Sequence, residues 1–231
     1  MSTGGPTGEP GMPAAPDGSV APAEERLAER LAGLSATEHP VAVRLAPVLR
    51  RLGHYDRLVY RAVARTHTPA LDEPLRRLSD LANFSKPWFA VAALLAVAGG
   101  PTGRRAALTG VAAIGAASLV VNQPMKQLGG RSRPDRVLHE VPRPRWVEMP
   151  TSTSFPSGHS ASAAAFAVSV GDVVPALRVP LRIAAGTVAF SRVHTGVHYP
   201  GDVAVGVVTG ALLGRLVSRV GARIGRAEVR V

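Results

Sequence analysis

The amino-acid sequence predicts an all-α fold with at least one helix that spans a membrane. Residues Ala106–Met125 form an uncharged run of twenty residues, long enough to cross a bilayer core of about 30 Å. Small residues dominate this run and the shorter apolar runs, as in helices that pack closely in lipid. The chain has a formal net charge of +11 and a mean hydropathy of +0.13, so its charges must be segregated from its apolar stretches.

Four further apolar runs are shorter or interrupted. Pro87–Pro101 carries no charge, Ser160–Gly171 and Val203–Gly214 are brief, and Leu181–Phe190 contains Arg182. Hydropathy alone therefore predicts one clear membrane span and four marginal ones. Buried helices of a compact soluble all-α domain would give a similar pattern, and that alternative stays open at this point.

Clusters of charge and proline indicate where the runs are connected. Arg104 and Arg105, directly after Gly103, indicate one tight connection, and Asp172–Arg182, with two prolines, indicates another. The long segment 127–156 contains five prolines, and we expect no helix to run through it.

The N-terminal part differs from the apolar part. Residues 1–22 hold five prolines and five glycines, which predicts a disordered tail, and they lack the basic start and apolar core of a signal peptide. Residues 24–84 are amphipathic, with leucines on one helical face and arginines opposite, which suits either a soluble core or an anionic membrane surface. We expect interfacial helices here, a membrane domain over residues 85–220 and a basic C-terminal tail over 221–231. The residues that carry the amphipathic pattern are Leu45, Val48, Leu49 and Leu52 with Arg44, Arg50 and Arg51, then Leu71, Leu75 and Leu78 with Arg76 and Arg77.

Composition excludes some classes of function. The chain has no cysteine, which excludes disulfides and thiolate metal sites. Its basic charge fits nucleic acid, an anionic membrane surface or an anionic substrate. An aromatic content of 4% and the lack of a zinc-finger or RRM-like motif count against nucleic acid as a partner.

The first candidate motif lies at the end of the best membrane run. Lys126 is followed after six residues by Arg133 and Pro134. Positive charge is common at the ends of membrane helices, so this motif alone is a weak functional signal.

The second motif is Phe155–Ser160, which leads directly into an apolar run. Pro156 and Ser157 are start signals for a helix, with Ser157 a good N-cap. The free N–H groups of a first helical turn bind anions, and Gly158 allows a phosphate to approach the backbone closely. His159 would then lie beside the anion.

The third motif closes one apolar run and opens the next. Ser191 and Arg192 are followed after five residues by His198 and after three more by Asp202. A carboxylate near an imidazole fixes its tautomer and stabilises its cation. The alternative is a polar loop in which Asp202 caps a helix.

Together, in this order and at the ends of apolar segments, the three motifs resemble the signature of the type 2 phosphatidic acid phosphatase superfamily. That signature is Lys, six residues, Arg-Pro; then Pro-Ser-Gly-His; then Ser-Arg, five residues, His, three residues, Asp, and all three parts match. The resemblance covers about residues 55–217, and the stretches 83–88 and 153–159 are most similar to actinobacterial members. It implies a polytopic membrane bundle of about five to six helices, with the site at one end.

The resemblance also implies a metal-independent phosphatase with a phosphohistidine intermediate. His198 would attack phosphorus, Asp202 would orient it, and His159 would protonate the leaving oxygen and then activate water. Fixed cations would do the work of a metal, so neither a metal nor another cofactor is expected. The substrate phosphate would be bound by Lys126, Arg133, Ser157, Gly158 and Arg192.

Several questions stay open at this stage. The head group fits phosphatidate, phosphatidylglycerol phosphate and polyprenyl phosphates or pyrophosphates alike, and no signature predicts an oligomeric state. A vanadium-dependent haloperoxidase shares this type of pocket but is usually longer and soluble, and a secreted acid phosphatase would need a signal peptide. A non-catalytic, basic membrane-binding protein is a further alternative, against which the complete set of motif side chains counts.

Charge also predicts an orientation in the cell membrane. Arginines follow the last apolar run and flank the connections opposite the motifs, which makes that end and the C-terminus cytoplasmic and the site extracytoplasmic. Five crossings would leave residues 24–86, with eleven basic residues, on the outer side as well. We therefore expect part of residues 45–85 to dip into or cross the bilayer.

Overall fold

The computed structural model describes residues 40–228, and this part of the chain is helical without a β-strand. The all-α prediction is confirmed. The predicted tail 1–22 and residues 229–231 of the predicted C-terminal tail lie outside the described residues. The helices are α2 (Pro40–Arg65), α3 (Pro69–Leu81), α4 (Lys86–Ala98), α5 (Gly100–Val120), α6 (Lys126–Gly129), α7 (Gly158–Val173), α8 (Arg178–His194) and α9 (Pro200–Glu228).

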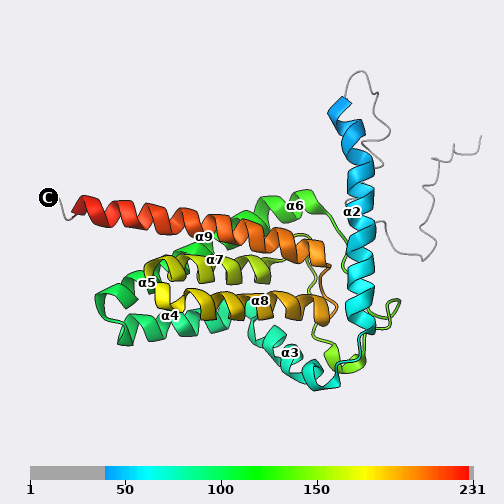
Figure 1. The fold of residues 1–231 in the computed structure, drawn as a ribbon, viewed down its shortest axis with the longest axis horizontal. Helices are drawn as coiled ribbons and strands as arrows, with labels where there is room; N and C mark the ends of the chain where they lie inside the picture. Colours follow the sequence, from blue (N-terminus) through cyan, green and yellow to red (C-terminus); the bar gives the residue numbers. More distant parts are fainter. Residues whose placement is uncertain (1–39, 229–231) are drawn as a thin grey trace, which may run out of the picture.

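Helix α7 is the centre of a bundle that also contains α4, α5, α8 and α9 (Figure 1). It packs against α9, α5 and α8, so it is surrounded by protein, and nearly every residue from Ser160 to Gly171 is buried. This explains its uniformly small and apolar sequence, since a helix that is apolar on all sides has no exposed face. Phe166 stacks on Trp88 of α4 with 5.5 Å between ring centroids and anchors the main core.

Three glycines allow α9 to lie directly against α7. Gly206, Gly210 and Gly214 recur every four residues on one face of α9. A Cβ atom at these positions would lie 2.5, 2.0 and 2.4 Å from backbone oxygens of α7, which no side chain could accommodate. This is the small-residue packing that the composition predicted for helices in lipid.

Two helices are long and apolar enough to cross a membrane, Gly100–Met125 and Pro200–Ile224. The first contains the predicted span. The run Val203–Gly214, a marginal span by hydropathy alone, lies within α9, which continues through Arg215 and Arg219 for several more turns and so reaches spanning length. A third candidate is the pair α3 and α4, which is bent by 68° at residue 82 and could form a broken span or a re-entrant loop.

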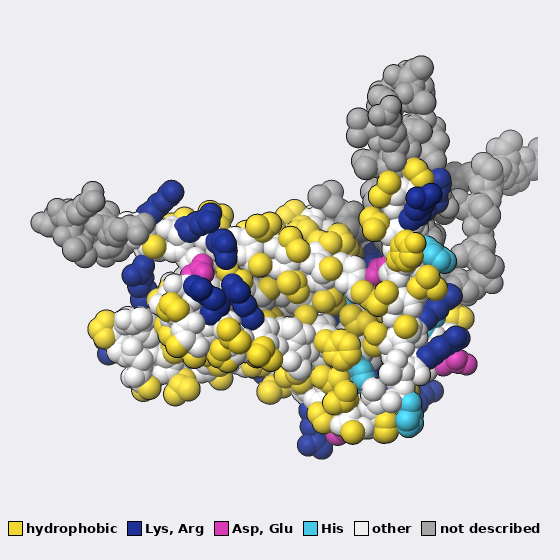
Figure 2. Space-filling model, in the orientation of Figure 1, with side chains coloured by type: hydrophobic (Ala, Val, Ile, Leu, Met, Phe, Trp, Pro, Cys, Tyr) yellow, Lys and Arg dark blue, Asp and Glu magenta, His cyan; other side chains and the backbone are white. Residues whose placement is uncertain are grey.

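The outer surface of the bundle is apolar, as lipid contact requires. Leu94, Val97, Leu108 and Leu212 are 66%, 85%, 74% and 66% exposed, respectively. Figure 2 shows hydrophobic side chains along the length of the bundle and Lys and Arg side chains gathered at the end where α9 finishes. A soluble domain of this size would expose much less contiguous apolar surface.

The connections lie at slightly different positions from those predicted. Arg104 and Arg105 lie within α5, and the tight turn precedes them at Gly99 and Gly100, where Gly100 has a φ of +58°. The second connection is limited to residues 174–177, because Pro180 lies in the first turn of α8, where its missing N–H leaves no helical bond unmade. The segment 127–156 contains only the short α6 and one 3₁₀ turn, as its prolines predicted.

Helix α2 runs across the end of the bundle instead of along it (Figure 1). Tyr60 and Ala64 on one side of α2 are buried against Val193 and Tyr199. Through these contacts α2 covers the end of the bundle where the three motifs lie.

Candidate active site

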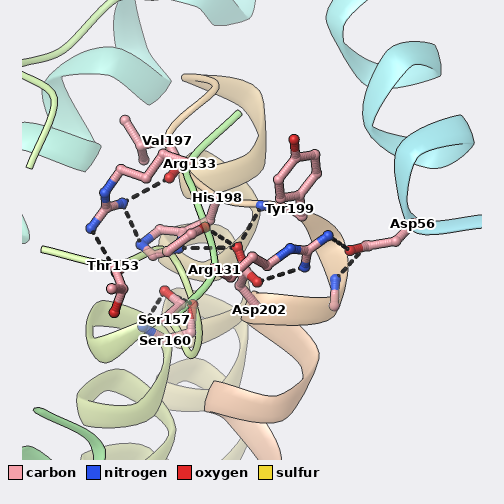
Figure 3. Close-up of polar contacts among 12 residues, drawn as sticks. Asp56, Arg131, Arg133, Thr153, Ser157, Ser160, Val197, His198, Tyr199 and Asp202 are labelled. Carbon is pink, nitrogen blue, oxygen red and sulfur yellow. Dashed lines mark hydrogen bonds and ion pairs between the residues drawn. The ribbon is translucent and has the colours of Figure 1, made fainter. Parts of the chain in front are cut away.

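The three sequence motifs converge at one end of the bundle. The start of α7 carries Ser157 and His159, the end of α8 carries Arg192, and Asp202 lies in the first turn of α9. The segment between α6 and α7 folds over this end and brings Arg133 to His198 (Figure 3).

The helix start at Ser157 agrees with the prediction. Ser157 is the N-cap of α7, where its side-chain oxygen accepts hydrogen bonds from Ser160 N at 3.4 Å and Ser160 Oγ at 2.9 Å. Its own N–H donates to the backbone oxygen of Asp202 at 3.0 Å. Thus the N-terminus of α7 is fixed against the start of α9, with Gly158 beside it.

The imidazole of His198 is buried and lies between a cation and a carboxylate. Its Nε2 lies 3.2 Å from NH1 of Arg133, and its Nδ1 lies 3.5 Å from Oδ2 of Asp202. Burial lowers the pKa of His198 to about 4, although Asp202 opposes this shift, and Arg133 and Arg192 lower the pKa further. The ring is therefore neutral at neutral pH and keeps a lone pair on one of its two nitrogens.

Asp202 is completely buried and accepts several hydrogen bonds. Oδ1 accepts from NH1 of Arg131 at 2.7 Å, and Oδ2 accepts from the backbone N–H of Tyr199 at 2.9 Å. The hydroxyl of Ser154 also donates to Oδ2. With this many donors the carboxylate keeps its charge and a single orientation next to His198.

Three cationic side chains surround the imidazoles. Lys126 Nζ donates to Ser152 Oγ at 3.0 Å, and Arg133 donates to the backbone oxygens of Ser152 and Val197 at 2.9 and 2.8 Å. Burial lowers the pKa of Lys126 and lowers that of Arg133 to about 10, so Arg133 keeps its charge at neutral pH.

Arg192 is held from the other side of the site. Its NH1 donates to the hydroxyl and the backbone oxygen of Ser79 on α3 at 2.6 and 3.1 Å, and its side chain is fully buried. Helix α3 therefore positions one of the three cations.

His159 has a partner that sequence analysis did not identify. Its Nε2 lies 2.9 Å from the side-chain oxygen of Asn83, in the short turn between α3 and α4. The stretch around Asn83 contributed to the family resemblance, but nothing in it indicated a role at the site. Phe84 and Ser85, which follow, both have a φ of +57°, so the turn that presents Asn83 has an unusual backbone.

Arg131, Asp56 and Ser154 were also missed. Arg131 lies among the six unspecified residues between Lys126 and Arg133, so the motif gives it no role. In the structure it contacts Asp202 and Asp56, which is 75 residues away along the chain. A pattern of motif spacings carries no signal for such a pair.

A second, largely buried polar group lies nearby and, within the described residues, is not hydrogen-bonded to His198 or Asp202. Its members are Thr68, Asp72, Arg145 and His194, which we call the Arg145 cluster. Arg145 donates to Asp72 at 2.8 Å and caps the C-terminal end of α2 through backbone oxygens, and His194 lies 3.0 Å from Asp72. The contact of His194 with Asp72 therefore supports the fold, which agrees with the position of His194 outside the motifs.

Two further polar side chains near the motifs, His139 and Arg136, make contacts that stabilise the loop between α6 and α7. His139 packs edge-on against Tyr60 at 5.3 Å, and Arg136 donates to the backbone oxygen of Val147 at 2.8 Å. Among residues 40–228, no group of three or more His, Asp or Glu side chains is arranged to hold a metal ion.

Comparison with known proteins identifies the family. The sequence profile of the PAP2 superfamily matches residues 107–226, more than half of the chain and the part that contains all three motifs. The chain belongs to the PAP2 superfamily. Decaprenylphosphoryl-5-phosphoribose phosphatase of Mycobacterium tuberculosis is 35% identical over 143 residues, which cover 60% of this chain and 74% of that protein. The protein of the same name from Mycolicibacterium smegmatis is 36% identical over 138 residues, 57% of this chain and 68% of its own length.

Two solved structures share the fold. The first transmembrane PAP2 type phosphatidylglycerolphosphate phosphatase from Bacillus subtilis superposes with a TM-score of 0.58 at 23% identity, covering 87% of this chain and 93% of that one. LpxE of Aquifex aeolicus superposes with a TM-score of 0.56 at 22% identity, covering 70% and 93%. The predicted polytopic membrane bundle is therefore confirmed as the architecture of this PAP2 protein.

Proposed function

We propose that this PAP2 protein is a membrane phosphatase that hydrolyses a lipid phosphate monoester through a phosphohistidine on His198. The observation that carries the proposal is the buried, neutral imidazole of His198, with Nδ1 toward Asp202 and Nε2 beside the Arg133 guanidinium. An anion that replaced the contact between Arg133 and Nε2 would bring phosphorus to the nitrogen lone pair. The names of the relatives support a lipid phosphate as the substrate class.

In the first step Nε2 of His198 forms a bond to phosphorus as the ester P–O bond breaks. The proton on Nδ1 stays between the ring and Asp202, which offsets the positive charge that develops on the imidazole. Burial and the surrounding cations lower the pKa of His159 in the free protein, so its proton would be taken up together with the phosphate dianion, whose charge offsets those cations. Protonated His159 then donates to the leaving alkoxide, which departs as the lipid alcohol. Asn83 holds the ring of His159 during this transfer.

In the second step water hydrolyses the phosphohistidine. His159, now neutral, accepts a proton from the water as its oxygen bonds to phosphorus, and the P–N bond returns its electrons to His198. The products are inorganic phosphate and the starting enzyme. Each step uses the same two histidines, so no further proton donor is required.

Charge stabilisation comes from the protein. Lys126, Arg133 and Arg192 would contact the equatorial oxygens of the transferring phosphoryl group, and the first N–H groups of α7, at Gly158 and His159, would donate to it. Such fixed donors do not need to reorganise during the reaction. We therefore propose that activity does not depend on a divalent metal.

The lipid tail would reach the site through the interfacial surface of α2. Val48, Leu52, Tyr55 and Val59 follow one another at spacings of four, three and four residues and are 49–63% exposed. This apolar stripe lies beside the buried face that contains Tyr60, while the arginines of α2 lie on the third face. With the bundle along the membrane normal, α2 would lie in the plane of the interface, as predicted for residues 24–84.

We propose that the site faces the extracytoplasmic side and that the C-terminus is cytoplasmic. The exposed arginines Arg105 and Arg219 line one pocket with Asp172 near the C-terminal end of α7, opposite the site. Arg104 and Arg215 lie within four residues of them in sequence, and the positive-inside tendency favours this end as cytoplasmic.

A cysteine placed at Glu140 should react with an impermeant thiol reagent in intact cells, and one placed at Gly225, beyond the candidate span Pro200–Ile224, should not. The reverse labelling would contradict this orientation.

The function is tested by phosphate release from a panel of lipid phosphates by the purified protein in detergent. Wild-type activity should persist in EDTA and decrease with orthovanadate, a mimic of the pentacoordinate state. Rapid quench with ³²P-labelled substrate should trap acid-labile, base-stable label that is absent from a His198→Ala variant. Label on serine, or activity that is lost in EDTA and restored by Mg²⁺, would refute the proposed chemistry.

A further inference from the structure

Arg131 links two carboxylates at the edge of the site. Its side chain is 2% exposed, its NH1 donates to Oδ1 of Asp202 at 2.7 Å, and its NH2 donates to Oδ2 of Asp56 at 2.6 Å (Figure 3). The guanidinium also lies over the ring of Tyr199, 4.0 Å from the centroid. Two charge-assisted hydrogen bonds and a stacked ring fix the guanidinium plane in one orientation.

Asp56 makes a second contact with the catalytic turn. Its Oδ1 accepts a hydrogen bond from the backbone N–H of Gly201 at 2.6 Å. A Cβ at Gly201 would lie 3.1 Å from Oδ2 of Asp56, so a glycine here allows the carboxylate of α2 to approach the turn. The carboxylate of Asp56 therefore fixes helix α2 to the segment 199–202. It binds the backbone N–H of Gly201 in that segment and the guanidinium of Arg131.

The arrangement determines which oxygen of Asp202 faces His198. Arg131 occupies Oδ1, which leaves Oδ2 for Ser154, the N–H of Tyr199 and the imidazole Nδ1 at 3.5 Å. If Arg131 were removed, the carboxylate could rotate and would lie near the carboxylate of Asp56 without an intervening cation. Two buried like charges would then raise the cost of keeping Asp202 ionised.

We propose that Arg131 and Asp56 are positioning residues of the phosphatase, which hold Asp202 in the orientation that aligns His198 with the phosphate. The proposal rests on the proposed function, because it assigns Arg131 and Asp56 a role through Asp202 and His198. It also gives α2 a role beyond the membrane surface, since Asp56 connects this interfacial helix directly to the catalytic turn.

The charges around His198 define what a change at Arg131 should do. Asp202 from α9, Arg133 from the loop, Arg192 from α8 and His159 from α7 face this imidazole. Loss of the Arg131 cation removes positive charge next to Asp202, so protonation of His198 becomes easier. The pKa of His198 should therefore rise in Arg131→Gln, and a residue with only a packing role would not move it.

The test compares Arg131→Gln, Arg131→Lys and Asp56→Asn with Arg145→Gln, a matched buried arginine that also pairs with an aspartate. Each variant is purified in detergent and assayed with p-nitrophenyl phosphate and with phosphatidate. We expect a decrease of about 10²-fold in kcat for Arg131→Gln with a nearly unchanged KM, a smaller decrease for Asp56→Asn, and partial recovery in Arg131→Lys. Arg145→Gln should keep the kcat of its folded fraction.

The titration of His198, followed by ¹⁵N NMR, tests the same inference without substrate. A rise in the His198 pKa in Arg131→Gln and a fall in Asp56→Asn, which removes a negative charge instead of a positive one, support it when Arg145→Gln leaves the pKa unchanged. Wild-type kcat and an unmoved His198 titration in folded Asp56→Asn would overturn it, even if Arg131→Gln fails to fold. A wild-type protein that releases phosphate from no member of the lipid-phosphate panel would refute the proposed function, while the titration still decides the role of Arg131.

Discussion

The two buried arginines of this end of the bundle have similar surroundings but different consequences. Arg131 and Arg145 are 2% and 1% exposed, and each bonds an aspartate from the N-terminal helices, Asp56 or Asp72. Arg131 uses its second amino group on Asp202, whereas Arg145 uses its remaining N–H groups on backbone and hydroxyl oxygens around the end of α2. The same chemistry closes a helix end in one place and, on our proposal, orients the carboxylate of Asp202 beside His198 in the other.

The difference lies in what each arginine leaves unsatisfied when it is removed. Without Arg145, the last carbonyls of α2 and the carboxylate of Asp72 lose donors, which weakens the fold. Without Arg131, a carboxylate beside the nucleophile loses its orientation, which weakens catalysis. Burial and a salt bridge alone do not distinguish the two arginines. The distinction comes from the further partner of each one, which is Asp202 for Arg131 and the backbone oxygens at the end of α2 for Arg145.

The largest contrast is expected between His198, which lies beside Asp202, and His194, which lies in the Arg145 cluster. His198→Ala should lower kcat by roughly 10⁴-fold or more while the protein stays folded, because it removes the nucleophile. His194→Ala, in the Arg145 cluster, should retain kcat within about tenfold and lower the melting temperature. Steady-state kinetics measure kcat and thermal unfolding in detergent measures the melting temperature of both variants. Equal losses of kcat would contradict the separation of a catalytic His198 from a structural His194.

Arg145→Ala should give the largest loss of stability. Breaking a buried ion pair by removing one partner costs about 3–5 kcal/mol, since the remaining charge of Asp72 is left without its partner. Unfolding in a denaturing detergent titration measures the change. Arg77→Ala on exposed α3, which also pairs with an acidic residue, is the control and should change stability by less than about 1 kcal/mol.

The pH profile separates the nucleophile from an ordinary histidine. Because the pKa of His198 is lowered to about 4, its imidazole stays deprotonated until the pH falls toward 4. The acid limb of kcat/KM, corrected for the second ionisation of the substrate phosphate, should lie near pH 4 and not near 6.5. An acid limb at pH 6.5 would mean that His198 is less buried than the structure indicates.

A smaller loss of kcat is expected at Asn83, which contacts His159 and belongs neither to the Arg145 cluster nor to the surroundings of Asp202. Asn83→Ala removes the 2.9 Å contact with Nε2 and should lower kcat by about fivefold, since one positioning hydrogen bond contributes about 1 kcal/mol. Phe84→Ala changes the next residue of the same turn, whose side chain is 86% exposed, and is the matched control. If both variants lose the same activity, the turn itself matters and not the Asn83 contact.

The sequence by itself determined the features that depend on neighbours along the chain. The twenty uncharged residues to Met125 predicted a membrane helix, Ser157 predicted the start of α7, and the spacing of His198 and Asp202 predicted their proximity. Helix capping, hydropathy and a four-residue spacing at a helix start act within one or two turns. Such rules can be applied before the chain is folded, and the family motifs are built from them.

Only the tertiary structure decided which distant residues complete the site. Asn83 reaches His159 from 76 residues away, and Asp56 reaches Arg131 from 75 residues away. Each pair depends on how α2 and the turn after α3 lie across the end of the bundle, and a single carboxylate or amide has no periodicity that could indicate it. The direction of α2 follows from burial of Tyr60 and Ala64 against the turn after α8, a packing choice that hydropathy along the chain does not specify.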